Sequence, residues 1–248
     1  MKRLIAVLVC FILLIRPEGC SSNNENKEEK REIVNENFYC KVIDENNIAI
    51  GGLKTYPENG AVFFPEQIEG YTVSKLGYNS PLRSGGPGYL YTGGIDDPFV
   101  KRYYFPHTIK EAISGYTSHL EMGLKMFYCG EVINLSCIDG RKSEVYVPAE
   151  KYELFNQAKS KYFYGSLLKA NVSYHLNYDE DNYYYVDYYE NGEKILYVPP
   201  IPQRDGYTFG GWFKEAECIN QWDFDVDTLQ LSEDIEEIKL YAKWIAEQ

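Results

Sequence analysis

The cysteines are the residues of this chain with the most chemistry to offer. Cys20 closely follows a basic and apolar leader, and four more thiols lie downstream of it. The thiols of Cys40, Cys129, Cys137 and Cys218 allow three disulfide connectivities, and buried free cysteine is an open alternative. The chain has no Cys-x-x-Cys pair, and its three histidines are far apart in sequence, so we predict no metal site.

Catalytic chemistry needs a nucleophile with a base, or a pair of positioned carboxylates. Ser114 and His119 lie in one loop-like stretch, but neither an acidic residue to orient the histidine nor a nucleophile elbow accompanies them. The acidic run 179–182 lacks the alternating ligand spacing and the glycine of a calcium loop, which favours a charged hairpin tip. We therefore predict no catalytic residue and no cofactor.

Residues 1–19 are typical of an export signal. Lys2 and Arg3 precede the apolar run Leu4–Ile15, which is too short to span a bilayer. The pair Gly19-Cys20, followed by two serines, resembles a bacterial lipoprotein signal. That resemblance implies that Cys20 becomes the lipidated first residue of the mature chain. Ordinary cleavage would instead leave the chain secreted.

The chain behind this signal is strongly acidic. Loss of the signal removes three basic side chains and one acidic side chain, which changes the net charge from −12 to −14. An acidic surface repels phosphate backbones, so we expect no nucleic-acid partner, and membrane association must come from the lipid anchor. Residues 20–37 are polar and charged enough to form a disordered tether.

Four short alternating runs, most of them ending near a proline, lie between residues 38 and 170. They are Val62–Pro65, Val100–Pro106, Leu124–Tyr128 and Val145–Ala149. An alternating run with a turn after it predicts one strand per unit. Together with the stretch Ile68–Gly77, these runs resemble BspA-type leucine-rich repeats. The resemblance implies a short, irregular solenoid over residues 38–170, closed by a helical segment at Glu150–Lys159.

The last third of the chain contains an ordered series of hairpin, turn and aromatic motifs. The tyrosine-rich runs Val172–Tyr178 and Tyr183–Tyr189 predict a hairpin, and Asn191-Gly192 predicts a second hairpin turn ahead of three prolines. In this order the motifs resemble the Listeria-Bacteroides repeat, which implies a small β-grasp-like domain over residues 171–248. The later motifs are Gly206–Phe213, Trp222–Phe224 and Leu240–Trp244.

The expected fold is therefore mainly β with minor helix, a leucine-rich-repeat-like solenoid followed by a β-grasp-like domain. We predict that Trp212, Trp222 and Trp244 fill the core of the second domain and do not stack on a sugar. A solenoid of about four units is near the smallest stable size, so we expect contact with the second domain to add burial.

These resemblances imply an exported, lipid-anchored cell-surface protein that mediates adhesion. Its partner would be a host or envelope protein or a glycan, bound through the repeat surface. A structural spacer or an envelope-assembly component, with no ligand of its own, is the alternative, and a secreted enzyme of unfamiliar type is a third possibility. Aromatic side chains on the predicted strands alternate between core and surface, and we take these as the candidate binding face. They are Tyr103, Tyr104, Phe127, Tyr128 and Tyr146.

Overall fold

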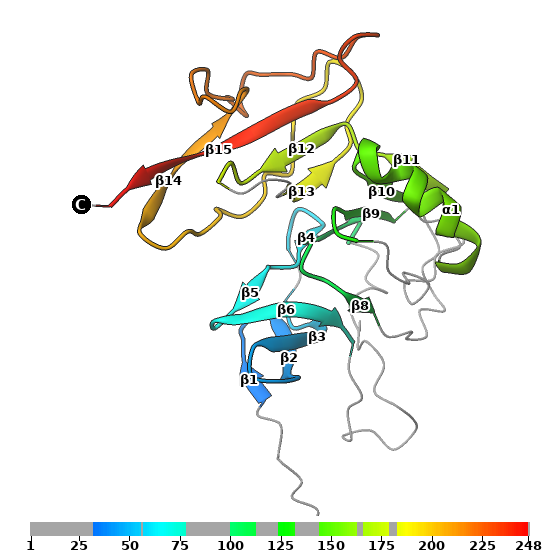
Figure 1. Ribbon diagram of the computed structural model, residues 1–248, viewed down its shortest axis with the longest axis vertical. Helices are drawn as coiled ribbons and strands as arrows, with labels where there is room; N and C mark the ends of the chain where they lie inside the picture. The colour runs from blue at the N-terminus through cyan, green and yellow to red at the C-terminus, as the bar shows by residue number, and fades with distance from the viewer. Residues whose placement is uncertain are drawn as a thin grey trace, which may run out of the picture.

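The computed structural model describes residues 32–55, 57–77, 100–112, 124–131, 144–162, 166–178 and 183–247. These residues form three β-sheets, one α-helix and one short 3-10 helix. The sheets are stacked along the long axis of the molecule, with the N-terminal sheet at one end and the C-terminal sheet at the other (Figure 1). The prediction of a mainly β fold with minor helix is confirmed.

The N-terminal sheet begins inside the predicted tether. Strand β1 (Glu32–Val34) pairs antiparallel with β2 (Phe38–Val42), and Ile33 is buried. Asn35 closes the turn between them by accepting hydrogen bonds from the backbone N–H groups of Asn37 and Phe38. The prediction of a disordered tether is therefore wrong for residues 32–37, because Ile33 adds to the apolar core. The strands are β1 (Glu32–Val34), β2 (Phe38–Val42), β3 (Asn47–Leu53), β6 (Tyr71–Leu76) and β5 (Gln67–Ile68) in this order, with β8 (Glu111–Ala112) also beside β6.

The central sheet is wholly parallel, and its strands follow one another in chain order. They are β4 (Ala61–Phe63), β7 (Arg102–Phe105), β9 (Lys125–Tyr128), β10 (Glu144–Val147) and β11 (Ser166–Lys169). The first four are the strands that the alternating runs predicted. After β10 the chain forms the 3-10 helix η1 (Ala149–Lys151) and the helix α1 (Tyr152–Tyr162), so the predicted helical segment is present.

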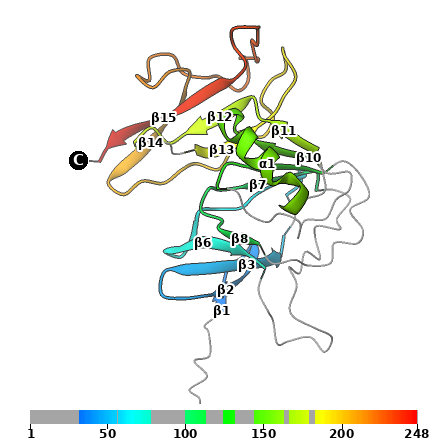
Figure 2. The same cartoon turned by 45° about the vertical axis from the view of Figure 1, so that its right-hand side comes forward.

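From β3 to β9 the chain alternates between these two sheets. Strands β3, β6 and β8 run parallel in the N-terminal sheet, whereas β4, β7 and β9 run parallel in the central sheet. Each turn of this coil adds one parallel strand to each layer, and the turn after β4 also adds the short antiparallel strand β5. The two layers lie one above the other (Figure 2). The leucine-rich-repeat identity of these turns stays a prediction.

Residues 171–178 and 183–247, here called the C-terminal module, form a four-stranded mixed sheet. Its strands are β13 (Tyr183–Asp187), β12 (Val172–His175), β15 (Ile238–Ala246) and β14 (Tyr207–Phe213), in this order. Strands β12 and β13 pair antiparallel, which confirms the first predicted hairpin. The β-grasp-like description of this sheet stays a prediction.

The second predicted hairpin, at Asn191-Gly192, is wrong. The turn itself forms, because Gly192 adopts a φ of 86° and the Glu193 N–H donates to the Glu190 carbonyl. The residues after it, however, belong to no strand until β14 begins. Three prolines in this segment have no N–H group to donate to a sheet, so the chain continues without strand pairing.

Two hydrophobic cores lie on opposite faces of the central sheet. Tyr103 and Phe105 of β7 enter the N-terminal core, which the central sheet shares with the N-terminal sheet. Tyr104 between them enters the C-terminal core, which the central sheet shares with the C-terminal module. The module thus covers an apolar face of the central sheet, and both faces of this parallel sheet are buried.

Candidate functional site

The five aromatic residues expected to form a binding face are all buried. Their side chains are no more than 3% exposed. Tyr103 and Tyr128 lie in the N-terminal core, and Tyr104, Phe127 and Tyr146 lie in the C-terminal core. These positions offer no surface to a ligand in this structure, which corrects the expectation. The physical reason is that a layer of protein covers each face of the central sheet.

Three of these residues belong to an aromatic ladder. In-register pairing places Phe63, Tyr104, Phe127 and Tyr146 side by side on β4, β7, β9 and β10. Successive ring centroids are 4.0, 4.6 and 5.0 Å apart. Tyr185 of β13 contacts Phe63 with its ring at 80° to the phenyl plane. The ladder is therefore a packing surface on which the C-terminal module is docked.

A buried ion pair connects this ladder to the C-terminal module. The Arg102 guanidinium donates to one carboxylate oxygen of Asp187 at 2.6 Å, and the Tyr104 hydroxyl donates to the other at 2.9 Å. Burial raises the pKa of Asp187 to about 6, although Arg102 opposes this effect. The guanidinium also lies over the rings of Tyr189 and Tyr197. Because Arg102 and Tyr104 together bind both carboxylate oxygens of Asp187, we regard the cluster as a structural link between two layers.

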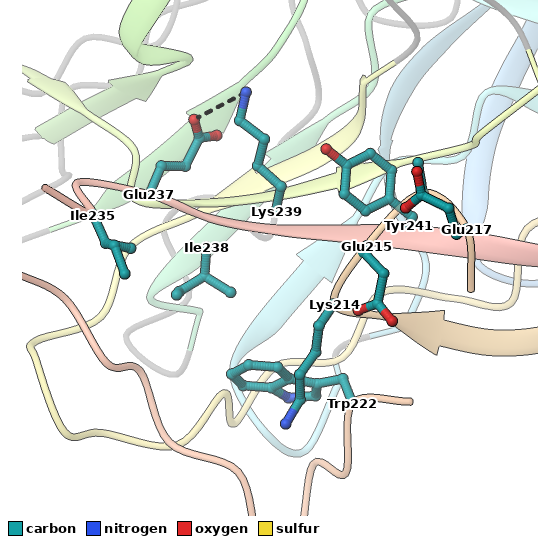
Figure 3. Close-up of a pocket in the computed structure, with 10 residues that line it drawn as sticks. Lys214, Glu215, Glu217, Trp222, Ile235, Glu237, Ile238, Lys239 and Tyr241 are labelled. Carbon is teal, nitrogen blue, oxygen red and sulfur yellow. Dashed lines mark ion pairs between the residues drawn. The ribbon is translucent and has the colours of Figure 1, made fainter. Parts of the chain in front are cut away.

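The C-terminal module has a hollow of about 550 Å³ beside β15. Strand β14 ends at Phe213, opposite Tyr241, so the first residues of β15 pair only with β12. The hollow lies at this step in the sheet, between β15 and the turn that follows β14 (Figure 3). Its apolar lining is Ala216, Trp222, Ile235 and Ile238, and its polar lining is Lys214, Glu215, Glu217, Glu237, Lys239 and Tyr241.

The lysines of this hollow already have acidic partners. Lys214 lies 2.8 Å from Asp227. Lys239 lies 3.8 Å from Glu237, and Figure 3 marks this pair. The Lys214 ammonium also lies 5.4 Å from the centre of the Trp222 ring. The hollow therefore presents an apolar wall beside two paired lysines, and its lining contains no arrangement of nucleophile and base.

Near the other end of β15, the Arg204 guanidinium lies over a group of aromatic rings. A tight turn, in which the Tyr207 N–H donates to the Arg204 carbonyl and Gly206 adopts a φ of 75°, directs the Arg204 side chain over the Tyr207 ring. The guanidinium carbon lies 3.9 Å from the centre of the Tyr207 ring, 4.6 Å from that of Tyr178 and 5.8 Å from that of Trp244. We call these four residues, Arg204, Tyr178, Tyr207 and Trp244, the Arg204 cluster.

The three tryptophans of the chain pack in the C-terminal core, as the sequence predicted. Trp212 and Trp222 are buried, and Trp244 is half-buried against the same cluster of side chains. The indole N–H of Trp244 donates to the Leu176 carbonyl, which fixes the ring at the margin of the core. Trp244 thus contributes to packing on one side and to the Arg204 cluster on the other.

Only some of the other residues that the sequence analysis singled out lie in the described ranges. Cys20, at the predicted lipidation site, and Cys137 lie outside the described residues. Cys40 and Cys129 are buried free thiols, and Cys218 is a half-buried free thiol. No group of three or more His, Cys, Asp or Glu side chains in the described ranges is placed to hold a metal ion. No helix of those ranges combines the length and the hydropathy needed to cross a bilayer. Also outside them are Ser114, His119 and residues 179–182.

Neither the ion pair of Arg102 and Asp187 nor the Arg204 cluster was predicted from the sequence. Arg102 and Asp187 are 85 residues apart, and no local spacing signals such a pair. The turn at Arg204 did have a local signal, because Asp205-Gly206 is a typical tight-turn dipeptide. The aromatic rings beneath the guanidinium come from separate parts of the module, so the cluster itself was not predictable from that signal.

Residues 171–243 match the family model of the Listeria-Bacteroides repeat domain. This range covers most of the C-terminal sheet, so the resemblance inferred from the aromatic and glycine motifs is confirmed for the module. The match concerns this part of the chain alone. The likeness of the preceding region to leucine-rich repeats stays a prediction.

Two proteins of Evansella cellulosilytica share sequence with this chain. One, named as a membrane protein, is 36% identical over 50 residues, which are 20% of this chain and 7% of that protein. The other, named as a Gly-rich membrane protein, is 29% identical over 76 residues, covering 26% of this chain and 8% of that protein. The matches span less than a tenth of either relative. Both names describe membrane proteins.

Proposed function

We propose that this protein is an exported, lipid-anchored binding protein of the cell envelope, which holds a partner through its C-terminal module. In this proposal the lipid is attached at Cys20, and the partner is a host or envelope protein or a glycan. The described residues between 32 and 170 form the base on which the module is docked. The protein has no catalytic role and needs no cofactor.

The distribution of exposed apolar side chains is the observation that supports this proposal. Ten large hydrophobic side chains are exposed among the described residues, and eight of them belong to the C-terminal module. Exposed apolar surface that is concentrated on one part of a protein is typical of an interaction site. The eight are Tyr178, Leu196, Val198, Ile201, Ile219, Val226, Ile235 and Ile245, against Tyr39 and Leu154 elsewhere.

The burial of the central sheet moves the proposed site away from the repeat surface. Both faces of that sheet are filled by the two cores, so its strands have no face left for a ligand. The module, by contrast, has the hollow beside β15, the Arg204 cluster and the exposed segment before β14. In that segment Leu196 and Ile201 are each 71% exposed. Contact with a partner is therefore proposed for the module.

The test uses the purified chain from residue 20 onward, on a panel of extracellular-matrix proteins, mucins and bacterial polysaccharides. We expect saturable binding to at least one member, with hydrogen-exchange protection on binding confined to the module. The double substitution Tyr178→Ser with Ile201→Ser should weaken this binding about tenfold, the usual effect of removing central apolar contacts.

The matched control is Leu154→Ser, which removes an exposed leucine from α1 and should leave the affinity unchanged. Protection that falls mainly in residues 32–170, or an equal loss of affinity in the control, would contradict binding through the module. An absence of binding to every member of the panel would favour the spacer and overturn the proposal.

A further inference from the structure

We infer that the Arg204 cluster binds the carboxylate of a terminal acidic sugar on a glycan. The inference rests on the proposed function, and it names the class of ligand and the residues that meet it. The sugar would be a sialic acid or a uronic acid, which share the carboxylate on a ring with otherwise neutral substituents.

The first ground is a cation that has no ion-pair partner in the part of the chain that the structure describes. Of the two arginines in the described residues, Arg102 is paired with Asp187, whereas Arg204 makes no ion pair with any described residue. The neighbouring carboxylate of Asp205 does not form an ion pair with Arg204 either. Stacking on aromatic rings occupies the faces of the guanidinium and leaves the N–H donors at its edge. Those donors form a planar fork whose geometry matches a carboxylate.

The second ground is the way in which this cation is held. The tight turn at Gly206 fixes the backbone of Arg204, and the hydrogen bond to the Leu176 carbonyl fixes Trp244. The cluster is thus ordered before a ligand arrives, which lowers the entropic cost of binding. Tyr178 remains 42% exposed, and Tyr207 is half-buried. Exposed ring surface beside a carboxylate-binding fork suits a pyranose acid, whose C–H face packs on the ring.

The third ground is the charge of the whole chain. The sequence has a net charge of −12, so a ligand with many negative charges is repelled as it approaches. A glycan that ends in one acidic sugar brings a single carboxylate to a single guanidinium, which has no ion-pair partner among the described residues. An acidic peptide brings several carboxylates to the same place, where they meet no further cation of the cluster. The charge balance therefore favours the acidic sugar over the acidic peptide.

The test measures binding of the chain from residue 20 onward to an array of matched glycans. The array holds sialylated glycans, uronic-acid-terminated glycans and the same structures without the acidic sugar, together with acidic peptides. We expect binding to the acidic glycans, a loss of at least about tenfold when the sugar is removed, and a similar loss for Arg204→Gln. Arg204→Lys keeps the charge but not the fork, so its loss should be intermediate.

The matched control is Lys54→Gln, since Lys54 lies over the Tyr39 ring at the opposite end of the molecule. It should bind like the parent chain. Binding that is independent of the sugar carboxylate, or unchanged in Arg204→Gln, would overturn the inference and leave the proposed function standing. Binding of acidic peptides in place of glycans would also overturn it. Failure to bind the array and every member of the wider panel would overturn both.

Discussion

The two cores of this protein lie on opposite faces of one sheet but are built from different side chains. The N-terminal core is largely aliphatic and contains two buried tyrosines, Tyr103 and Tyr128. The C-terminal core contains seven buried tyrosines and adjoins the ion pair of Arg102 and Asp187. Aliphatic packing between coil layers needs no directional bond, whereas the docked module is also positioned by hydrogen bonds.

The difference shows how a module is fixed on a repeat-like base. The Tyr185 hydroxyl donates to the Phe64 carbonyl at 2.8 Å, and the Tyr104 hydroxyl donates to Asp187 at 2.9 Å. Such bonds form only in one relative placement, so they select the orientation in which the two parts meet. Tyrosine supplies both the apolar ring and the polar end, which explains part of the high tyrosine content of this chain.

The largest expected effect comes from breaking the ion pair of the C-terminal core. Asp187→Asn leaves Arg102 buried without a counter-charge, and we expect a loss of about 3–5 kcal/mol in the free energy of unfolding. Urea denaturation measures this loss. The exposed pair of Lys75 and Glu111 is the matched control, because Glu111→Gln should cost less than about 1 kcal/mol. Equal losses in the two variants would show that the buried pair has no special role.

The next test asks whether the two cores unfold together. Met126→Ala opens a cavity in the N-terminal core and should cost about 2–4 kcal/mol. All three tryptophans lie in the C-terminal module, so their fluorescence reports on the other core. We expect the unfolding midpoints measured by fluorescence and by circular dichroism to shift equally. A fluorescence midpoint that stays in place would mean that the module is stable without its base.

A smaller effect concerns pH. Burial lowers the pKa of His175 to about 4, against an ordinary value of 6.5. Between these values the unfolded chain binds a proton that the folded chain does not, so this histidine makes stability fall as the pH falls from about 6.5 to 4. Asp187 acts in the opposite direction, because its folded pKa of about 6 exceeds its ordinary 3.8.

The variant His175→Gln separates these two contributions. Between pH 7 and pH 4.5 its free energy of unfolding should rise, relative to that of the parent chain, by about 2 kcal/mol. The measurement is urea denaturation of both proteins at several pH values. A difference that stays constant with pH would show that His175 titrates normally in the folded chain.

The smallest expected effect concerns exposed side chains, which should contribute little to the free energy of unfolding. Ile201→Ser and Leu154→Ser each remove an exposed side chain, and each should change the free energy of unfolding by less than about 0.5 kcal/mol. Thermal unfolding followed by circular dichroism is sufficient to check this. A loss of more than about 1 kcal/mol in Ile201→Ser alone would assign that side chain to folding and weaken the case for a contact surface.

The strands of the central sheet were predictable, but the burial of both their faces was not recognised. Each of β7, β9 and β10 begins with a charged residue and continues with three apolar ones, Arg102–Phe105 being the first example. As alternating runs, these strands would turn one face outward. A continuous apolar run is instead typical of a strand buried on both sides, so the signal was present in the sequence.

The rest of the fold and the candidate site depended on contacts that no short segment encodes. Strand β1 lies in a polar stretch, which forms a strand only because it pairs with β2. The link between Arg102 and Asp187 requires the module to fold back onto the base. The rings of the Arg204 cluster gather from three distant positions, Tyr178, Tyr207 and Trp244. Local sequence patterns predicted individual strands and turns, whereas the charged clusters form only when these elements pack together.

The stacking order of the sheets also determines how the molecule would respond to a pulling force. The described chain starts at β1, at one end of the long axis, and the C-terminal module lies at the other end (Figure 1). Tension between a tethered N-terminus and a ligand on the module would cross both cores in series. Resistance at the upper junction would come from the ion pair and the tyrosine hydrogen bonds. At the lower junction, the chain itself passes repeatedly between the two sheets, so covalent backbone would oppose their separation.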